Sequence, residues 1–590
     1  MADVSTLFDI FEGLAGSGKD AVQLRRDGPG RWSPISARDF SFTVRSLSLG
    51  LNALGIQPGD RVAILSENRP EWAMTDYAVV CGGALTVPIY ATLPAEQIVG
   101  LLADSGAKVI VVSTAEQLEK IRAIRGRCPA LDHVVCIDAD PPDEPGYERW
   151  MKTVDRGRGN LEMGSTVFES RGRRISPDDP CTIIYTSGTT GEPKGAVLTH
   201  GNFVSNVKAC CEVVPFAPNA IALSFLPLSH VFERMIDYAY SYKKSTIAYL
   251  GDFAQLRDAL VEVEPTVFGA VPRVYEKIYA GVRESVAGSA IKRAIFAWAS
   301  RQGRRRLERL ERGEAHPTSL GIRLADKLVF SKLRARLGPR FGFAVSGGAP
   351  LARELAEFFW GAGVTIYEGY GLTETSPVIC VNGPRAWKLG TVGRPVPGVE
   401  VKIASDGEIL TRGPHVMRGY FGKPAETAAV IDADGWFATG DIGELDDGFL
   451  RITDRKKDVI VLSGGKKAAP QPIENALKQF PLIGLPVVIG NGRKFLSALI
   501  VPNFDALKHA GIDPGRLDGP EARAAFQKEI DAYNRDKPHH EQIRAFALLP
   551  HDLTLESGEI TPTMKVKRRV VENEFKARID RMYEEDPHAA

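Results

Sequence analysis

The sequence predicts an α/β protein whose first part is built on doubly wound, mainly parallel sheets. Two patterns support this fold class. Over the first 180 residues, short apolar runs alternate with segments of helical periodicity, which is typical of strand–helix units in a parallel sheet. From Thr391 onward, glycines and prolines recur between short strands, which indicates a small β-rich unit followed by a compact α+β unit.

Individual elements follow from the same patterns. Runs of β-branched and aliphatic residues predict strands, and apolar residues three or four positions apart predict helices. In the first part, strands are expected at residues 61–65, 108–112, 182–185, 196–198, 221–226, 266–271 and 343–345, and helices at 95–103 and 115–124. In the later part, strands are expected at 399–403, 408–410, 459–462, 487–489 and 496–501, and helices at 472–478 and 521–534.

The composition is that of a globular protein with more than one folded unit. The chain has 590 residues, of which 44% are apolar and 25% are charged. Lysine and arginine (74) nearly balance aspartate and glutamate (73), so the global charge predicts neither a nucleic-acid nor a membrane partner. The seven cysteines show neither zinc-ligand nor C-x-x-C spacing, which predicts reduced thiols in a reducing compartment.

Three segments bear on targeting and membrane contact. The N-terminus lacks a basic segment followed by an apolar core, so no signal peptide is expected. The most apolar run, residues 77–93, contains two glycines and a proline and suits a buried core element better than a membrane span. The third segment, residues 291–312, carries six arginines from Arg301 to Arg312 among apolar residues. It fits either a solvated helix face or a basic amphipathic helix in peripheral contact with an anionic membrane.

The segment Tyr185-Thr-Ser-Gly-Thr-Thr-Gly-Glu-Pro-Lys-Gly195 is the most informative one in the chain. Its small hydroxyl groups, its accessible backbone N–H groups and the charge of Lys194 suit a polyphosphate. Strands are expected on both sides of this loop, whereas a helix follows the loop of a Walker A motif. A second glycine-rich segment, residues 13–20, ends in Asp20 where Walker A needs Ser or Thr, so we do not expect it to bind nucleotide.

Three further clusters suit a nucleotide ligand. A Ser-Gly-Gly-Ala-Pro segment ending at Pro350 lets backbone approach a flat group closely, because glycine has no side chain. A second cluster offers Tyr370 to stack on a base, Thr373 to bond a phosphate oxygen and Glu374 to hold Mg²⁺. Asp441 follows a tight turn, where a buried carboxylate could accept from a ribose diol. Each cluster alone is also compatible with an ordinary loop or turn.

Together, the four clusters resemble the adenylate-forming enzyme superfamily, which includes acyl-CoA synthetases, firefly luciferase and peptide-synthetase adenylation domains. The resemblance extends over roughly residues 30–575. Three more stretches are similar to long-chain acyl-CoA synthetases: Phe-Leu-Pro-Leu-Ser-His-Val-Phe-Glu-Arg ending at Arg234, Val-Pro-Arg-Val-Tyr-Glu-Lys ending at Lys277, and Thr-Pro-Thr-Met-Lys-Val-Lys-Arg ending at Arg568.

This resemblance implies a set of nucleotide-binding residues. They belong to the phosphate loop, to two glycine-containing segments and to a ribose-binding pair. The set is Thr186, Ser187, Gly188, Thr189, Thr190, Gly191, Lys194, Gly348, Ala349, Gly369, Tyr370, Gly371, Thr373, Asp441 and Arg455. Glu374 would bind Mg²⁺.

The resemblance also implies catalytic roles. Lys194 and Thr373 would offset charge on the phosphates, and His230 would help to place the substrate carboxylate. Lys565 would contact that carboxylate and the α-phosphate, with Lys567 as the nearby competitor for this role.

The domain organisation implied by the resemblance has two parts. Residues 1–456 would form an N-terminal domain of two doubly wound sheets plus a small β-barrel subdomain, holding the ATP and fatty-acid sites. Residues 457–590 would form a small, mobile α+β domain that carries Lys565 and rotates about a hinge at Lys457.

The implied activity is a two-step ligase reaction. ATP would activate a long-chain fatty acid to acyl-AMP with release of pyrophosphate, and coenzyme A would then receive the acyl group. Two alternatives stay open: an acyl-AMP ligase that passes its product to a carrier protein, and a catalytically silent fatty-acid or nucleotide binder. The intact set of charged site residues favours an active enzyme, because a silent relative is free to lose them. The expected location is the cytoplasm, with peripheral contact at the inner membrane surface.

Overall fold

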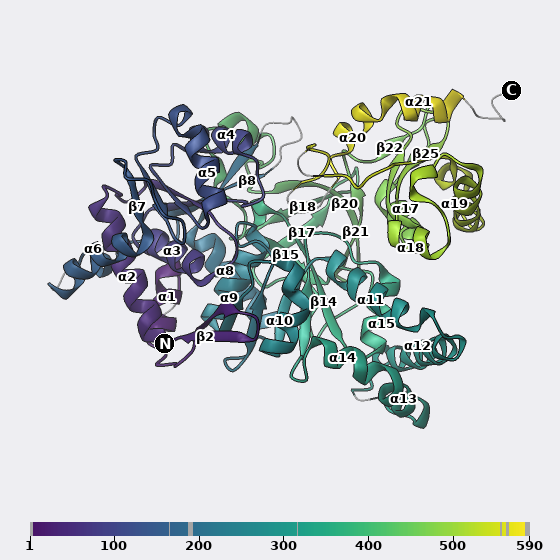
Figure 1. Cartoon of the computed structure of the whole chain (residues 1–590), viewed down its shortest axis with the longest axis horizontal. Helices are drawn as coiled ribbons and strands as arrows, with labels where there is room; N and C mark the ends of the chain where they lie inside the picture. Colours follow the sequence, from purple (N-terminus) through teal and green to yellow (C-terminus); the bar gives the residue numbers. More distant parts are fainter. Residues whose placement is uncertain are drawn as a thin grey trace. The chain divides into compact units, whose positions relative to one another are not determined.

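The computed structural model describes residues 4–163, 166–186, 193–315, 317–554, 557–561 and 566–584, and Figure 1 shows the whole chain. Its contacts divide into two compact units. The first contains residues 1–402, 410–438 and 445–451, and the second contains residues 403–409, 439–444 and 452–590. The predicted boundary after residue 456 therefore lies a few residues inside the last segment of the second unit. The predicted α/β class is confirmed.

A nine-stranded mixed sheet forms one half of the first unit, in the order β16-β15-β14-β13-β12-β10-β11-β1-β2. Six of these strands run parallel: β1 (Gln23–Gly28), β10 (Ile221–Ser224), β11 (Thr246–Tyr249), β12 (Val267–Ala270), β13 (Phe343–Ser346) and β14 (Thr365–Gly371). The remaining strands pair antiparallel with a neighbour: β2 (Arg31–Ile35) with β1, β15 (Val378–Val381) with β14, and β16 (Arg394–Pro395) with β15.

An eight-stranded sheet forms the other half, in the order β19-β9-β8-β4-β3-β5-β6-β7. Its parallel strands are β3 (Arg61–Leu65), β4 (Leu85–Ile89), β5 (Val109–Val112), β6 (His133–Cys136), β7 (Tyr147–Arg149) and β8 (Pro180–Thr186). β9 (Lys194–Thr199) pairs antiparallel with β8, and β19 (Gly419–Tyr420) pairs antiparallel with β9. The central strands are apolar on both faces because helices cover both sides of a parallel sheet.

Helices precede, link and follow the strands of the first unit (Figure 1). They are α1 (Leu7–Ala15), α2 (Ala37–Ala53), α3 (Pro70–Cys81), α4 (Ala95–Ser105), α5 (Ala115–Ile124), α6 (Trp150–Glu162), α7 (Val167–Gly172), α8 (His200–Val213), α9 (Val231–Tyr242), α10 (Leu256–Val263), α11 (Pro272–Ala287), α12 (Ala290–Glu311), α13 (Leu320–Ala325), α14 (Ser331–Leu337), α15 (Arg353–Gly361) and α16 (Pro424–Ala428). All of α3 and nearly all of α9 are buried, so these two helices lie in the interior of the unit.

The apolar run at residues 77–93 forms the end of α3 and the whole of β4, which confirms the prediction of a buried core element. Across the described ranges, no helix is both long and apolar enough to cross a membrane.

The second unit contains an α+β fold, as predicted for the C-terminal region. Its three-stranded sheet has the order β24-β25-β26, and a two-stranded sheet precedes it. The elements are β22 (Ile460–Val461), β23 (Lys467–Ala468), α17 (Pro470–Leu477), β24 (Ile483–Ile489), β25 (Leu496–Pro502), α18 (Phe504–His509), α19 (Pro520–Asn534), β26 (Ile543–Leu548), α20 (Arg568–Glu574) and α21 (Lys576–Glu584). Alternate residues of β25 enter two different apolar clusters, because successive side chains of a strand point to opposite faces.

A four-stranded sheet occupies the β-rich region predicted after Thr391, where the resemblance implies a small barrel. Its strands are β17 (Glu400–Ile403), β18 (Glu408–Arg412), β20 (Phe437–Asp446) and β21 (Phe449–Arg455), in the order β17-β18-β20-β21. The residues of this sheet belong partly to the first unit and partly to the second.

Candidate active site

One edge of the nine-stranded sheet carries several of the predicted site residues. The strands β14, β13, β12 and β10 are consecutive parallel neighbours, so their carboxyl ends meet at the same edge. Gly348 and Ala349 follow β13, and His230 lies in the loop after β10. Tyr370 is the next-to-last residue of β14. Ligands of open α/β sheets bind at such an edge. The structure therefore brings these residues together.

The turn after β14 requires a glycine at position 371, the last residue of that strand. A Cβ atom at Gly371 would lie 1.6 Å from the carbonyl oxygen of Pro377. The Thr375 hydroxyl donates to the same oxygen at 2.6 Å and accepts from the Leu372 N–H at 2.9 Å. A short 3₁₀ turn, Thr373–Thr375, is held in this way. It positions the two predicted phosphate and magnesium residues, Thr373 and Glu374.

Tyr420 connects Glu374 with Lys194. The Tyr420 hydroxyl donates to the Glu374 carboxylate at 2.9 Å, and the Lys194 ammonium lies 5.3 Å from the centre of the Tyr420 ring. Lys194 also forms an ion pair with Glu426. Burial, followed by the nearby charge of Glu374, raises the pKa of Tyr420, so its hydroxyl stays protonated and can donate. A cation from the start of β9 and a carboxylate from the turn after β14 thus meet at one tyrosine side chain.

Sequence reasoning did not identify Tyr420. The residue is in this position because β19 pairs with β9, where Tyr420 lies opposite Ala196. The two strands are separated by more than 200 residues of sequence, and β19 is only two residues long. No local pattern marks so short a strand.

The predicted phosphate loop is flanked by paired strands. Thr186 ends β8 and lies opposite Lys194 at the start of β9, and its hydroxyl donates to the Lys194 carbonyl at 3.4 Å. The strand–loop–strand arrangement predicted for this motif is confirmed by these flanks. Five of the predicted loop residues, Ser187, Gly188, Thr189, Thr190 and Gly191, and the predicted catalytic residue Lys565 lie outside the described residues.

Lys19 of the Walker-like segment near the N-terminus contacts two backbone carbonyls of the first unit. Lys19 donates to the backbone carbonyls of Pro218 and Lys244, at 2.6 and 2.5 Å. Its ammonium group therefore binds the protein's own backbone.

The loop that carries His230 is held by Asn68. The Asn68 side-chain amide donates to the Leu226 carbonyl at 2.5 Å, and its oxygen accepts from the Leu228 N–H at 2.9 Å. His230 itself caps the N-terminus of α9, and its Nδ1 accepts from the Phe232 N–H at 3.1 Å. One buried asparagine thus fixes the backbone from which His230 emerges. Sequence reasoning missed Asn68, although a polar run at the end of an apolar strand is a usable signal.

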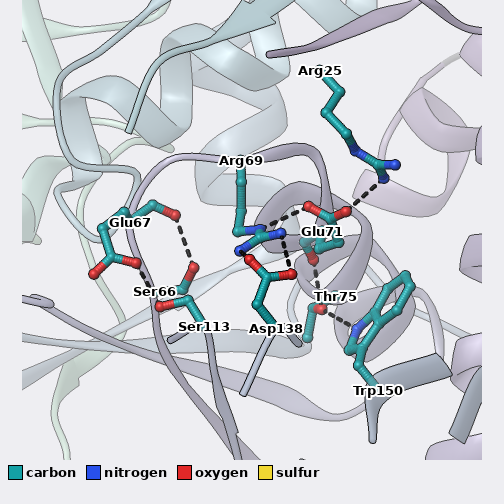
Figure 2. A network of polar contacts seen from close by, with 9 residues as sticks. All are labelled: Arg25, Ser66, Glu67, Arg69, Glu71, Thr75, Ser113, Asp138 and Trp150. Atoms are coloured by element: carbon teal, nitrogen blue, oxygen red, sulfur yellow. Dashed lines mark hydrogen bonds and ion pairs between the residues drawn. The ribbon is translucent and has the colours of Figure 1, made fainter. Parts of the chain in front are cut away.

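Ion pairs and hydrogen bonds anchor the loop around Asn68 (Figure 2). The Glu67 carboxylate accepts from the Ser113 hydroxyl, and the Arg69 guanidinium donates to Glu71 at 2.8 Å and to Asp138 at 2.7 Å (Figure 2). These partners come from α3 and from the ends of β5 and β6. The loop is therefore attached to one helix and to the ends of two strands of the eight-stranded sheet, and these attachments hold the backbone that carries Asn68.

A buried ion pair joins α9 to the eight-stranded sheet. Arg234 on α9 is 1% exposed and donates through Nε to the Asp76 carboxylate of α3 at 2.9 Å. It also donates to the Thr182 hydroxyl at 2.7 Å, and Tyr238 donates to Asp76. Thr182 lies on β8, four residues before Thr186 of the phosphate loop. This network connects the helix after His230 with the strand before the phosphate loop.

The second unit brings together the two predicted ribose residues. Arg455 Nε lies 3.3 Å from the buried carboxylate of Asp441. The turn before Asp441 is fixed by Thr439, whose hydroxyl accepts from the Asp441 N–H at 3.1 Å, and by Gly440, which has a φ of 73°. The next residue after Arg455, Lys456, forms ion pairs with Asp406 and Glu408 at 2.6 and 2.7 Å. The predicted hinge residue, Lys457, follows directly.

Known proteins are similar in sequence to this chain over nearly its full length. Residues 12–421 match the model of the family "AMP-binding enzyme", and residues 457–587 match its C-terminal domain. The chain is 40% identical over 587 residues to the long-chain-fatty-acid–CoA ligase FadD15 of Mycobacterium bovis, covering 96% of this chain and 95% of that protein. It is 33% identical to the peroxisomal long chain acyl-CoA synthetase 6 of Arabidopsis thaliana, covering 100% of this chain and 88% of that protein.

Among solved structures, the adenylation domain of a carboxylate reductase from Mycobacterium chelonae is similar in fold. It superimposes with a TM-score of 0.74 at 23% identity, covering 99% of this chain and 92% of that one. The matched family model covers more than half of the chain, and the relatives match it over nearly its full length. The chain therefore belongs to the AMP-binding enzyme family.

Proposed function

We propose that the chain is a long-chain-fatty-acid–CoA ligase that forms AMP. The observation that carries this proposal is the meeting of Lys194 and Glu374 on Tyr420, beside the sheet edge that holds Tyr370 and His230. That arrangement offers a cation for phosphate oxygens, a carboxylate for a divalent ion and an aromatic ring for a base. The full-length similarity to ligases named for long-chain fatty acids supports the choice of acid.

In the first half-reaction, an oxygen of the fatty acid carboxylate attacks the α-phosphorus of ATP and pyrophosphate leaves. Negative charge develops on the α-phosphate and on the leaving group. Lys194 and the Thr373 hydroxyl would offset this charge, together with Lys565. The Asn68 contacts hold the His230 loop, so that His230 would orient the incoming carboxylate. Asp441 and Arg455 would hold the ribose.

Glu374 fits a magnesium ligand. One of its oxygens accepts from Tyr420, which leaves the other oxygen for a metal ion. No cluster of three or more metal-ligating side chains occurs in the part of the chain that the structure describes. This donor set suits Mg²⁺, which commonly takes one or two protein carboxylates and completes its shell with water and substrate phosphates. Bound there, the ion would neutralise phosphate charge.

In the second half-reaction, the thiol of coenzyme A attacks the carbonyl of acyl-AMP, and AMP leaves. The acyl group is already activated, so no cysteine of the enzyme has to act as a nucleophile. The cysteines agree with this, because burial raises the pKa of Cys136 to about 11 and of Cys181 to about 12. Rotation of the C-terminal region about Lys457 would present Lys565 in one step and open the thiol path in the other.

Pyrophosphate release from ATP and Mg²⁺ with palmitate, measured with and without coenzyme A, tests this function. We expect continuous turnover to AMP and palmitoyl-CoA only when coenzyme A is present. A single burst of pyrophosphate with retained adenylate, unchanged by coenzyme A, would identify an acyl-AMP ligase that serves a carrier protein. Binding of ATP and palmitate without any pyrophosphate would identify a silent binder.

Tyr420→Phe is expected to raise the Mg²⁺ concentration needed for half-maximal pyrophosphate release. The change keeps the ring beneath Lys194 and removes only the donor to Glu374. Because a hydrogen bond to a charged group contributes about 1.5–3 kcal/mol, an increase of at least about tenfold is expected. The KM for palmitate is the internal control and should stay near that of the parent enzyme. An unchanged Mg²⁺ requirement would show that Tyr420 does not position Glu374.

Asn68→Ala is expected to impair use of the fatty acid more than use of ATP. The change leaves the Leu226 carbonyl and the Leu228 N–H without their buried partner, at a cost of about 1–3 kcal/mol. We expect the KM for palmitate to rise about tenfold while the KM for ATP changes less than about twofold. Ser66→Ala is the matched control, because the Ser66 hydroxyl donates to the neighbouring Glu67 carbonyl. Equal loss with both substrates would show only a general structural role.

The protein is proposed to act in the cytoplasm and to touch the inner surface of the membrane peripherally. The charge of the Arg301–Arg312 region is the basis of this part of the proposal.

A further inference from the structure

A helix next to the arginine-rich segment exposes a row of leucines. α13, a π-helical turn (Asp326–Phe330) and α14 together form one helical stretch, residues 320–337, which is named the α13–α14 helix here. Its inner face is buried, including Ile322, Phe330 and Leu333. On its outer face, however, Leu320 is 77%, Leu324 43% and Leu328 46% exposed. A single exposed leucine is ordinary, but three at a spacing of four residues form an apolar ridge.

Positive charge surrounds this ridge. Arg323, Lys327 and Lys332 are exposed on the same helix, between and beyond the leucines. Residues 290–340 contain fourteen lysines and arginines against four aspartates and glutamates, although the whole chain has a net charge of only +1. Leucines interleaved with cations on a helix are typical of a surface that lies in the headgroup region of an anionic bilayer. Nucleic acid would use the cations but not the leucines.

A cavity of about 490 Å³ lies beside the α13–α14 helix and is lined by three arginines, Arg306, Arg323 and Arg334, and one carboxylate, Asp326. Arg334 is already paired, because it donates to Asp326 at 2.7 and 2.9 Å. The Nε of Arg306 is buried and has no hydrogen-bond partner among the described residues. Burial, followed by the nearby charge of Arg334, lowers the pKa of Arg306. Two guanidinium groups thus remain for an anion the size of a phosphate.

The neighbouring helix α12 is less suited to a membrane than its sequence indicates. Three of its apolar residues, Phe296, Trp298 and Leu310, pack against the core of the first unit. Arg309 forms an ion pair with Glu314 at 2.6 Å. The apolar face of α12 is therefore partly used within the protein. In Figure 1, α12 and α13 lie at the outer edge of the first unit.

We propose that the α13–α14 helix docks the protein on a bilayer that contains anionic phospholipid. Leu320, Leu324 and Leu328 enter the apolar boundary of the leaflet, Arg323 and Lys327 remain at the headgroup level, and the arginine cavity takes a lipid phosphate. This inference specifies the surface that makes the membrane contact proposed above, and it does not depend on ligase activity. It places the enzyme on the phase in which a long-chain fatty acid dissolves.

Sedimentation of the full chain with vesicles, without ATP or fatty acid, tests this docking. We expect the protein to pellet with vesicles of equal parts phosphatidylcholine and phosphatidylglycerol and to stay in solution with phosphatidylcholine alone. The triple change Leu320→Ser, Leu324→Ser and Leu328→Ser should weaken binding at least about tenfold. The pair Arg323→Glu and Lys327→Glu should weaken it similarly. Far-UV circular dichroism and the melting temperature check that each variant is folded.

A matched control removes apolar side chains of similar exposure elsewhere on the first unit. Met151, Met163 and Val261 are 50%, 80% and 60% exposed, and their joint replacement by serine should leave vesicle binding unchanged. The proposal is overturned if the parent protein ignores anionic vesicles or binds neutral ones equally well. It is also overturned if the leucine triple binds like the parent, which would indicate a purely electrostatic surface. Preference for a competing RNA over vesicles would likewise contradict it. None of these outcomes affects the pyrophosphate assay.

Discussion

Lys565→Ala is expected to lower the rate of acyl-AMP formation by a factor of about 10²–10³, the usual effect of removing one contact to a developing oxyanion. Lys565 would contribute this contact to the α-phosphate only during the first half-reaction. Coenzyme A attack on acyl-AMP that is supplied ready-made should therefore change much less. ATP–pyrophosphate exchange measures the first step, and thioester formation from synthetic palmitoyl-AMP measures the second.

Lys567→Ala is the matched control for this prediction. Lys567 lies two residues further along the chain, and its backbone N–H donates to the Glu559 carbonyl at 2.7 Å. It should keep near-normal adenylation if Lys565 is the catalytic lysine. A larger loss in Lys567→Ala would move the assignment to Lys567. Equal loss of both half-reactions in Lys565→Ala would contradict a role confined to adenylation.

The elements that sequence periodicity predicted well are the buried parallel strands and the amphipathic helices. Residues 61–65 form β3 and residues 115–124 form α5 with the expected bounds. Both have a simple pattern: β3 is apolar because helices cover both faces of its sheet, and α5 buries one face. In these segments the local pattern reflects the tertiary environment directly.

The interior helices could not be predicted in the same way. α9 contains Glu233, Arg234 and Asp237, which in sequence are typical of a solvated face, yet all three are buried. Their burial depends on partners distant in sequence, above all Asp76, which lies 158 residues before Arg234. The candidate site residues likewise divide into those that a local motif identifies and those that only the tertiary structure places. Glu374 and Lys194 were identified from motifs, whereas Tyr420 and Asn68 owe their positions to strand pairing and loop packing.

Asp76→Ala is expected to destabilise the first unit by about 3–5 kcal/mol, because it leaves the Arg234 guanidinium buried without its counter-charge. Asp76 accepts hydrogen bonds from Arg234, from the Tyr238 hydroxyl and from the Thr86 hydroxyl at 2.8 Å, so one change breaks the whole network. Chemical denaturation followed by tryptophan fluorescence should show a clearly lower midpoint for the first unit. Removal of one partner of an exposed ion pair, as in Arg122→Ala, should lower the free energy of unfolding by less than about 1 kcal/mol.

The double change Asp76→Leu and Arg234→Met separates the value of the ion pair from the cost of breaking it. Taking two charges out of water offsets much of their mutual attraction, so apolar residues of similar size should recover most of the stability lost in Asp76→Ala. Recovery of stability without recovery of adenylation would show that the pair acts on function. Arg234 also donates to Thr182 on the strand that leads into the predicted phosphate loop, and His230 caps the N-terminus of α9. We therefore expect the double variant to fold well but to bind ATP and palmitate more weakly. A double variant that is as unstable as Asp76→Ala would contradict this reasoning, because it would make the charges themselves the source of stability.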